Sequence, residues 1–114
     1  MTSLTITPGR PLQGTISVPG DKSITHRAII LTALANGVSR VARYCRGEDC
    51  LNTMRAFQSF GIRIDESVEE LCVHGKGFWG LTEPSGPVDC GNSGTGIRLL
   101  TGLLAGQDFF TVLT

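Results

Sequence analysis

Residues 19–27, with the sequence PGDKSITHR, combine the residue types that hold an anion. A Pro-Gly pair interrupts the preceding strand pattern, and Asp21 or Ser23 is suited to cap the helix that follows. The free N–H groups and the dipole of a first helical turn favour a phosphate or carboxylate. Lys22 adds a compact charge and Arg27 a planar fork that fits phosphate oxygens. The segment therefore predicts an anion site at the start of a helix.

A second segment, CGNSGTGIR at residues 90–98, repeats this order of residue types. A glycine, then an Asx residue, and an arginine seven positions after the glycine occur in both: Gly20, Asp21 and Arg27, then Gly91, Asn92 and Arg98. An apolar stretch that ends at a glycine follows each segment. The pattern indicates an internal repeat of one supersecondary unit, although a match this short also arises by chance.

The elements that would position these segments alternate as in an α/β protein. We expect strands at residues 14–18 and 38–44, and a helix at 23–35. A second helix begins near Glu48 and Asp49, which suit its positive end, and stops at Gly61. Its buried stripe is expected to consist of Leu51, Met54, Phe57 and Phe60. Residues 62–65 and 71–74 are typical of a hairpin around the acidic turn 66–70.

The order of these elements defines three segments within one partial domain, residues 1–114. Residues 13–75 form a first βαβαββ unit, residues 76–87 form a loop rich in Gly and Pro, and residues 88–114 begin a second unit. The β-rich run 109–113 reaches the end of the sequence, so the second unit is incomplete. We therefore expect the chain to be a piece of a longer protein.

Composition excludes several classes of protein. Ten basic residues balance ten acidic ones, and this balance, with one Trp and one Tyr, argues against a nucleic-acid surface or a membrane-binding face. No apolar run has the length of a bilayer span, and the N-terminus lacks a secretory pattern. The cysteines form no CxxC pair, and His26 and His74 are not placed as zinc partners. We therefore expect no metal site, a cytoplasmic location and free thiols at Cys45, Cys50, Cys72 and Cys90.

Three motifs, in this order, resemble one enzyme family. PGDKSITHR at 19–27, GEDCLNT at 47–53 and GNSGTGIRLLTGLLAG at 91–106 resemble the N-terminal quarter of the 5-enolpyruvylshikimate-3-phosphate synthases. The resemblance covers residues 12–114. It implies the inside-out α/β barrel of the enolpyruvyl transferases, of which this chain would supply about one and a half βαβαββ repeats. It also implies an active site between the two globular halves of the full-length enzyme. Residues 4–18 would belong to one half and the rest of this chain to the other.

The resemblance further implies a reaction. Family members transfer the enolpyruvyl group of phosphoenolpyruvate to the 5-hydroxyl of shikimate 3-phosphate and release phosphate, with no metal or organic cofactor. By this resemblance Lys22 touches both substrates and is the catalytic candidate. Ser23 and Arg27 would hold shikimate 3-phosphate. A cation between two polyanions offsets their repulsion and stabilises charge in the transition state, which agrees with the place of Lys22.

The second motif supplies the other expected site residues. By the resemblance, Asn92, Gly94 and Thr95 form the loop at phosphoenolpyruvate, and Arg98 lies in the same motif. Glycine at position 94 suits this loop, because a residue without Cβ lets the backbone approach a phosphate closely. The family's herbicide, glyphosate, would occupy the same pocket. The expected partners are the two substrates and the remainder of the enzyme, in the same chain or as a second fragment.

Each of these interpretations has an alternative. Asp21 and Ser23 also serve as simple caps, residues 92–96 as a plain loop, and Glu48 with Asp49 as partners of the helix dipole. The two histidines suit structural roles. The chain as a whole could be a non-catalytic anion-binding or complementation fragment. A UDP-N-acetylglucosamine enolpyruvyl transferase is a weaker alternative, because that enzyme shares the repeat without the PGDKS and HR pattern. In every case we expect the chain to be inactive alone.

Overall fold

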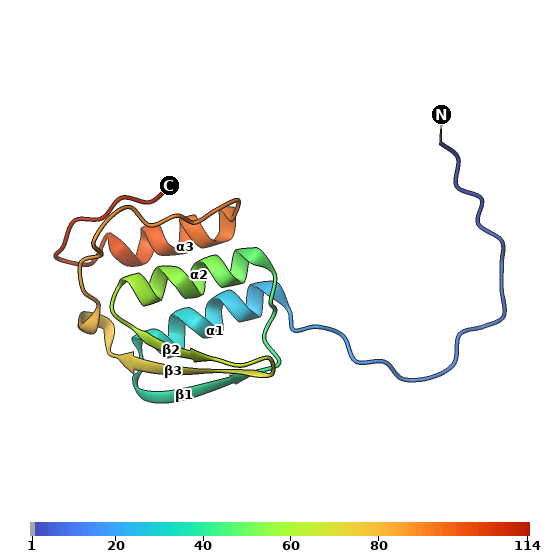
Figure 1. Cartoon of the computed structure of the whole chain (residues 1–114), viewed down its shortest axis with the longest axis horizontal. Coiled ribbons are helices and arrows are strands. Elements are labelled where there is room, and N and C mark those ends of the chain that lie inside the picture. Colours follow the sequence, from blue (N-terminus) through green and yellow to red (C-terminus); the bar gives the residue numbers. More distant parts are fainter. Residues whose placement is uncertain (1) are drawn as a thin grey trace.

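The computed structural model describes residues 2–114 and arranges their elements in layers (Figure 1). A three-stranded sheet forms one side, α1 and α2 cover it, and α3 lies on α2, away from the sheet. The elements in chain order are α1 (Lys22–Leu34), β1 (Asn36–Ala42), α2 (Glu48–Ser59), β2 (Arg63–Glu66), β3 (Glu70–Lys76), the short 3-10 helix η1 (Phe78–Gly80) and α3 (Gly94–Leu104). No helix among the described residues is both long and apolar enough to cross a membrane.

The sheet has the strand order β1-β3-β2, and both strand pairs are antiparallel. Ile64 of β2 pairs with Val73 of β3, and both are buried against the helices. Because side chains alternate across a sheet, the neighbouring pair of Asp65 and Cys72 lies on the opposite face. The hairpin predicted at residues 62–65 and 71–74 is therefore confirmed, with a tighter turn than expected.

The start of α1 depends on two residues before it. Asp21 is the N-cap, and its Oδ1 accepts a hydrogen bond of 2.7 Å from the backbone N–H of Ile24. The alternative cap, Ser23, lies inside the helix. Gly20 packs against the backbone carbonyl of Arg43, where any Cβ would collide. The close approach ties the entry of α1 to the segment that follows β1, so Gly20 cannot be replaced without moving that segment.

The structure confirms the predicted bounds of α2 and most of the buried stripe predicted for it. Glu48 and Asp49 occupy its first turn, where carboxylates favour the helix dipole. Phe57 and Phe60 are fully buried and meet edge to face, with ring centroids 6.0 Å apart. Gly61 ends the helix with a φ of 85°, a left-handed conformation that glycine adopts at little cost.

The predicted strand at residues 14–18 is wrong for this chain. These residues form no strand in the structure, and Ile16 and Val18 are 85% and 74% exposed. A strand requires a neighbour for its backbone N–H and C=O groups, and none of the described elements pairs with this segment. The segment instead extends away from the folded body (Figure 1).

The C-terminal part differs from the prediction in two ways. The apolar stretch that follows the second motif, residues 99–106, predicts a helix, but α3 already begins inside the motif, at Gly94. The strands expected from residue 88 and at 109–113 reduce to one isolated parallel bridge between Val88 and Leu113. Within residues 2–114 no named strand adjoins this bridge, so it does not extend into a ladder.

Candidate active site

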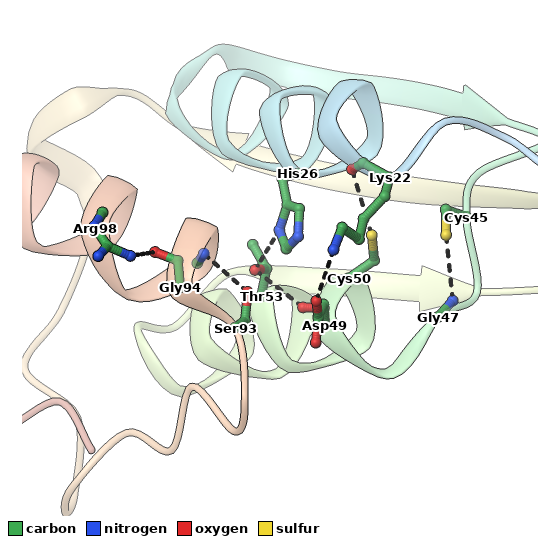
Figure 2. Close-up of polar contacts among 11 residues, drawn as sticks. Lys22, His26, Cys45, Gly47, Asp49, Cys50, Thr53, Ser93, Gly94 and Arg98 are labelled. Carbon is green, nitrogen blue, oxygen red and sulfur yellow. Dashed lines mark hydrogen bonds and ion pairs between the residues drawn. The ribbon is translucent and has the colours of Figure 1, made fainter.

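The N-terminal ends of α1, α2 and α3 lie together at one end of the helical layer, and residues from all three helices meet there (Figure 2). Lys22 begins α1 and Asp49 lies in the first turn of α2. Gly96, in the first turn of α3, packs toward Thr53 of α2. Three helix N-termini therefore present unpaired N–H groups and positive dipole ends to one region.

Lys22 and Asp49 form an ion pair across this end. The Lys22 Nζ donates a hydrogen bond of 3.1 Å to Asp49 Oδ2. The hydrogen bond and the charge of the Asp49 carboxylate raise the pKa of Lys22 above its usual value, so the side chain is held protonated. Lys22 is 55% exposed and Asp49 27%, so the ammonium group stays accessible to a ligand from solvent.

His26 and Thr53 form a second, buried contact one helical turn below the ion pair. His26 Nδ1 lies 2.8 Å from Thr53 Oγ1, and both residues are buried. Thr53 Oγ1 donates in turn to the Asp49 carbonyl at 3.4 Å, so its oxygen accepts from the imidazole and the proton belongs on Nδ1. Burial lowers the pKa of His26, which keeps the ring neutral. His26 Nε2 has no hydrogen-bond partner within residues 2–114.

The Lys22–Asp49 and His26–Thr53 contacts join α1 to α2 with the same offset along the chain. Each joins a residue of α1 to the residue 27 positions later in α2. Positions four apart lie on the same face of a helix, so Lys22 with His26, and Asp49 with Thr53, form two matching faces. The packing of α1 on α2 therefore sets the position of the Lys22 ammonium group.

Ser23 and Arg27 lie beside Lys22 on the exposed side of α1. The guanidinium Nη1 of Arg27 donates 3.0 Å to the backbone carbonyl of Ser23. The Ser23 hydroxyl takes no part in this hydrogen bond, and both Ser23 and Arg27 are exposed. The structure thus brings together the three predicted site residues of the first motif.

The second motif forms a similar arrangement at the start of α3. Arg98 Nη1 donates 3.0 Å to the Gly94 carbonyl, which repeats the spacing and geometry of Arg27 with Ser23. Ser93, rather than Asn92, is the N-cap, and its Oγ accepts from Gly96 N at 2.9 Å. Asn92 is exposed and Thr95 is half-buried. Helix α2 lies between this group and that of the first motif (Figure 1), so the two groups face a common end, and no hydrogen bond or ion pair among the described residues joins them.

Comparisons with known proteins agree with this arrangement of motifs. Residues 6–114 match the family described as EPSP synthase (3-phosphoshikimate 1-carboxyvinyltransferase). The chain belongs to the EPSP synthase family. It is 58% identical over its full length to the 3-phosphoshikimate 1-carboxyvinyltransferase of Pelobacter propionicus, of which it covers 26%. It is 54% identical, again over its full length, to that of Geobacter sulfurreducens, of which it covers 27%.

A solved structure extends the likeness to the EPSP synthase fold. The EPSP synthase from Acinetobacter baumannii matches with a TM-score of 0.85 and 43% identity, over 89% of this chain and 23% of that one. The α/β fold expected from the motifs is therefore confirmed. The chain spans about a quarter of the length of the curated EPSP synthases that it matches.

The structure adds one residue, Asp49, to those predicted for the candidate site, and it gives Gly96 a packing role beside it. The sequence predicts Asp49 as a partner of the helix dipole, and the structure shows that its carboxylate also accepts a hydrogen bond from Lys22. Gly96 was not singled out, yet a Cβ there would lie 2.8 Å from Ser93 Oγ and 3.3 Å from Thr53 Oγ1. A possible signal was the helical spacing of Asp49 and Thr53, which matches that of Lys22 and His26.

Proposed function

We propose that this chain forms one part of the active site of an EPSP synthase, which transfers enolpyruvyl from phosphoenolpyruvate to the 5-hydroxyl of shikimate 3-phosphate and releases phosphate. The names of its relatives, 3-phosphoshikimate 1-carboxyvinyltransferases, support the reaction class. The observation that carries the proposal is the Lys22–Asp49 pair at the meeting point of three helix N-termini. Such an end attracts anions, and both substrates are polyanions.

In this proposal Lys22 is the catalytic residue, and Asp49 orients it. The ion pair favours the Lys22 rotamer in which the ammonium group lies at this end of the helices, so less side-chain entropy is lost when a substrate arrives. A lysine is protonated at neutral pH, so its ammonium group would offer a full positive charge between the two substrates. A preorganised charge of this kind stabilises negative charge that develops in the transition state.

The remaining predicted residues would divide between the two substrates. Ser23 and Arg27, which lie together on α1, would hold shikimate 3-phosphate. Asn92, Gly94 and Thr95 would form the phosphoenolpyruvate loop at the N-terminus of α3. The Arg98 guanidinium covers the Gly94 carbonyl here and would adjust when a phosphate arrives.

The site would be completed by further polypeptide. Large apolar side chains of the N-terminal segment and of α1 are exposed, and further polypeptide that packs on them would remove this apolar area from water. The largest of these exposed groups are Leu4, Ile6, Leu12, Ile16, Val18, Ile24 and Leu31. We place the protein in the cytoplasm, since the four cysteines of this chain are free thiols.

A complementation assay tests the proposal. Phosphate release from phosphoenolpyruvate and shikimate 3-phosphate is measured for this chain, for the Pelobacter propionicus relative from the position equivalent to residue 115 onward, and for their mixture. We expect turnover in the mixture alone. Turnover by the isolated chain would contradict the role of a partial site. An inactive mixture whose fragments demonstrably associate would favour the non-catalytic alternative.

A further inference from the structure

The outer face of the sheet, on the side away from the helices, gathers three potential metal ligands. Asp65 of β2 is the direct cross-strand partner of Cys72 of β3, and His74 lies two residues further along β3 on the same face. His74 Nε2 lies 2.8 Å from Asp65 Oδ2 and 3.9 Å from Cys72 Sγ. All three ligand atoms lie within 4.8 Å of one another. The hairpin register therefore creates a cluster that the spacing along the chain does not reveal.

The geometry of this cluster does not fit a nucleophile with its base. In a catalytic triad, the acid and the nucleophile contact opposite nitrogens of the imidazole. Here Asp65 and Cys72 approach the same atom, His74 Nε2. A thiol, an imidazole nitrogen and a carboxylate oxygen that converge on one point are instead the ligand types of a metal ion.

We propose that Asp65, Cys72 and His74 bind Zn²⁺, with water in the fourth position. Tetrahedral Zn²⁺ has bonds of about 2.0–2.3 Å, which place its ligand atoms about 3.3–3.8 Å apart. The Cys72–His74 separation of 3.9 Å is close to that range, and the Asp65–His74 pair must open by roughly half an ångström from 2.8 Å. All three side chains are at least partly exposed, so the ion enters without unfolding the sheet.

Binding requires a defined movement of protons. The Cys72 thiol releases its proton to solvent, and the His74 proton resides on Nδ1 so that the Nε2 lone pair meets the metal. Asp65 supplies a carboxylate, the oxygen ligand type that Zn²⁺ accepts beside a thiolate and an imidazole nitrogen. Arg63 Nε contacts the other carboxylate oxygen, Oδ1, at 3.0 Å, which leaves Oδ2 for the metal.

Two arginines on the same face limit the affinity. Arg63 lies directly across from His74, and Arg40 directly across from Cys72. Arg40 is in part neutralised by Glu70 at 3.8 Å, whereas Arg63 shares Asp65 with the metal. Their repulsion of a divalent cation makes this an exchangeable site that fastens β2 to β3 when zinc is present. It does not depend on the proposed transferase activity, because it lies on the opposite face of the sheet from the helices.

A cobalt titration tests the site directly. Co²⁺ is added to the purified chain, and Zn²⁺ is then added to displace it. A thiolate ligand produces a cobalt charge-transfer band in the near ultraviolet, and tetrahedral coordination produces intense visible bands. We expect one equivalent to bind with both signals and Zn²⁺ to remove them. Cys72→Ser should abolish the charge-transfer band, while Cys45→Ser, which alters another partly exposed thiol, should retain it.

The remaining variants assign the other two ligands. His74→Ala should weaken Zn²⁺ binding at least tenfold, Asp65→Asn should weaken it less, and Arg63→Met should strengthen it severalfold. Far-ultraviolet circular dichroism checks that each variant is folded, and Zn²⁺ should raise the thermal midpoint of the wild type but not of Cys72→Ser. A charge-transfer band that persists in Cys72→Ser, or the absence of binding at millimolar Zn²⁺ to the folded wild type, would overturn the proposal.

Discussion

Lys22 and Asp49 belong to the first turns of two different helices, and their side chains meet at 3.1 Å. One turn further, the same two helix faces bring His26 to within 2.8 Å of Thr53. The exposed ion pair therefore lies one helical turn from the buried hydrogen bond, between the same two helix faces. Because the buried contact sets the spacing and rotation of α1 on α2, it also determines where the Lys22 charge is presented.

Loss of the Lys22 charge should reduce the rate of the complemented enzyme strongly. Removing one group that stabilises transition-state charge typically costs on the order of a hundredfold in kcat. We expect at least that loss for Lys22→Met and little change for the control Arg43→Met, an exposed cation outside the candidate site. Arg27→Ala should mainly raise KM for shikimate 3-phosphate. Equal kcat losses for the Lys22 and Arg43 variants would refute the site assignment.

A methyl group at Gly94 should weaken the binding of glyphosate more than the binding of phosphoenolpyruvate. The added Cβ would lie 2.8 Å from Arg98 Nη1, so that guanidinium must shift. We expect Gly94→Ala to weaken glyphosate, the slightly longer ligand, more than phosphoenolpyruvate, and the wild type to be sensitive. Gly102→Ala on the same helix is the matched control, because its Cβ meets nothing within 4 Å. Inhibition and substrate constants that change in parallel would show that Gly94 does not line the pocket.

A methyl group at Gly96 should destabilise the fold rather than alter ligand choice. The Cβ would lie 2.8 Å from Ser93 Oγ, the oxygen that caps α3, and 3.3 Å from Thr53 Oγ1. Losing a cap and overpacking a helix contact each cost about 1–2 kcal/mol, so urea denaturation should show a loss of that order or more. Gly102→Ala should instead be neutral or slightly stabilising, since alanine favours a helix. Comparable free energies of unfolding for the two variants would contradict this packing.

Acid should destabilise the protein through His26. Burial lowers the pKa of the folded-state imidazole below its ordinary 6.5, so the unfolded chain binds the proton more readily. The contribution of a neutral His26 is complete above pH 6.5 and declines as the pH falls below that value. The slope reaches at most about 1.4 kcal/mol per pH unit for one group. Urea titrations between neutral and mildly acidic pH should show this slope in the wild type and in His74→Gln. A His26→Gln variant that keeps the slope would assign it to another group.

The sequence by itself determined the local features of this protein. A cap at Asp21 or Ser23, the acidic first turn of α2, the stop at Gly61 and the hairpin all follow from interactions within a few residues. Capping, dipole and turn preferences act at that range, so the printed order of residues is sufficient to predict them. The family motifs could be recognised from the sequence because each is one continuous segment.

Only the tertiary structure decided which of these segments meet. The Lys22–Asp49 and His26–Thr53 contacts span 27 residues, and no local preference specifies the rotation of one helix on another. The hairpin register likewise placed Asp65 opposite Cys72. The predicted strand at residues 14–18 failed on the same principle, because its β-prone sequence has no neighbouring strand in this chain to receive its backbone hydrogen bonds. Helix caps are satisfied locally, whereas helix packing and strand pairing require a partner from elsewhere in the fold.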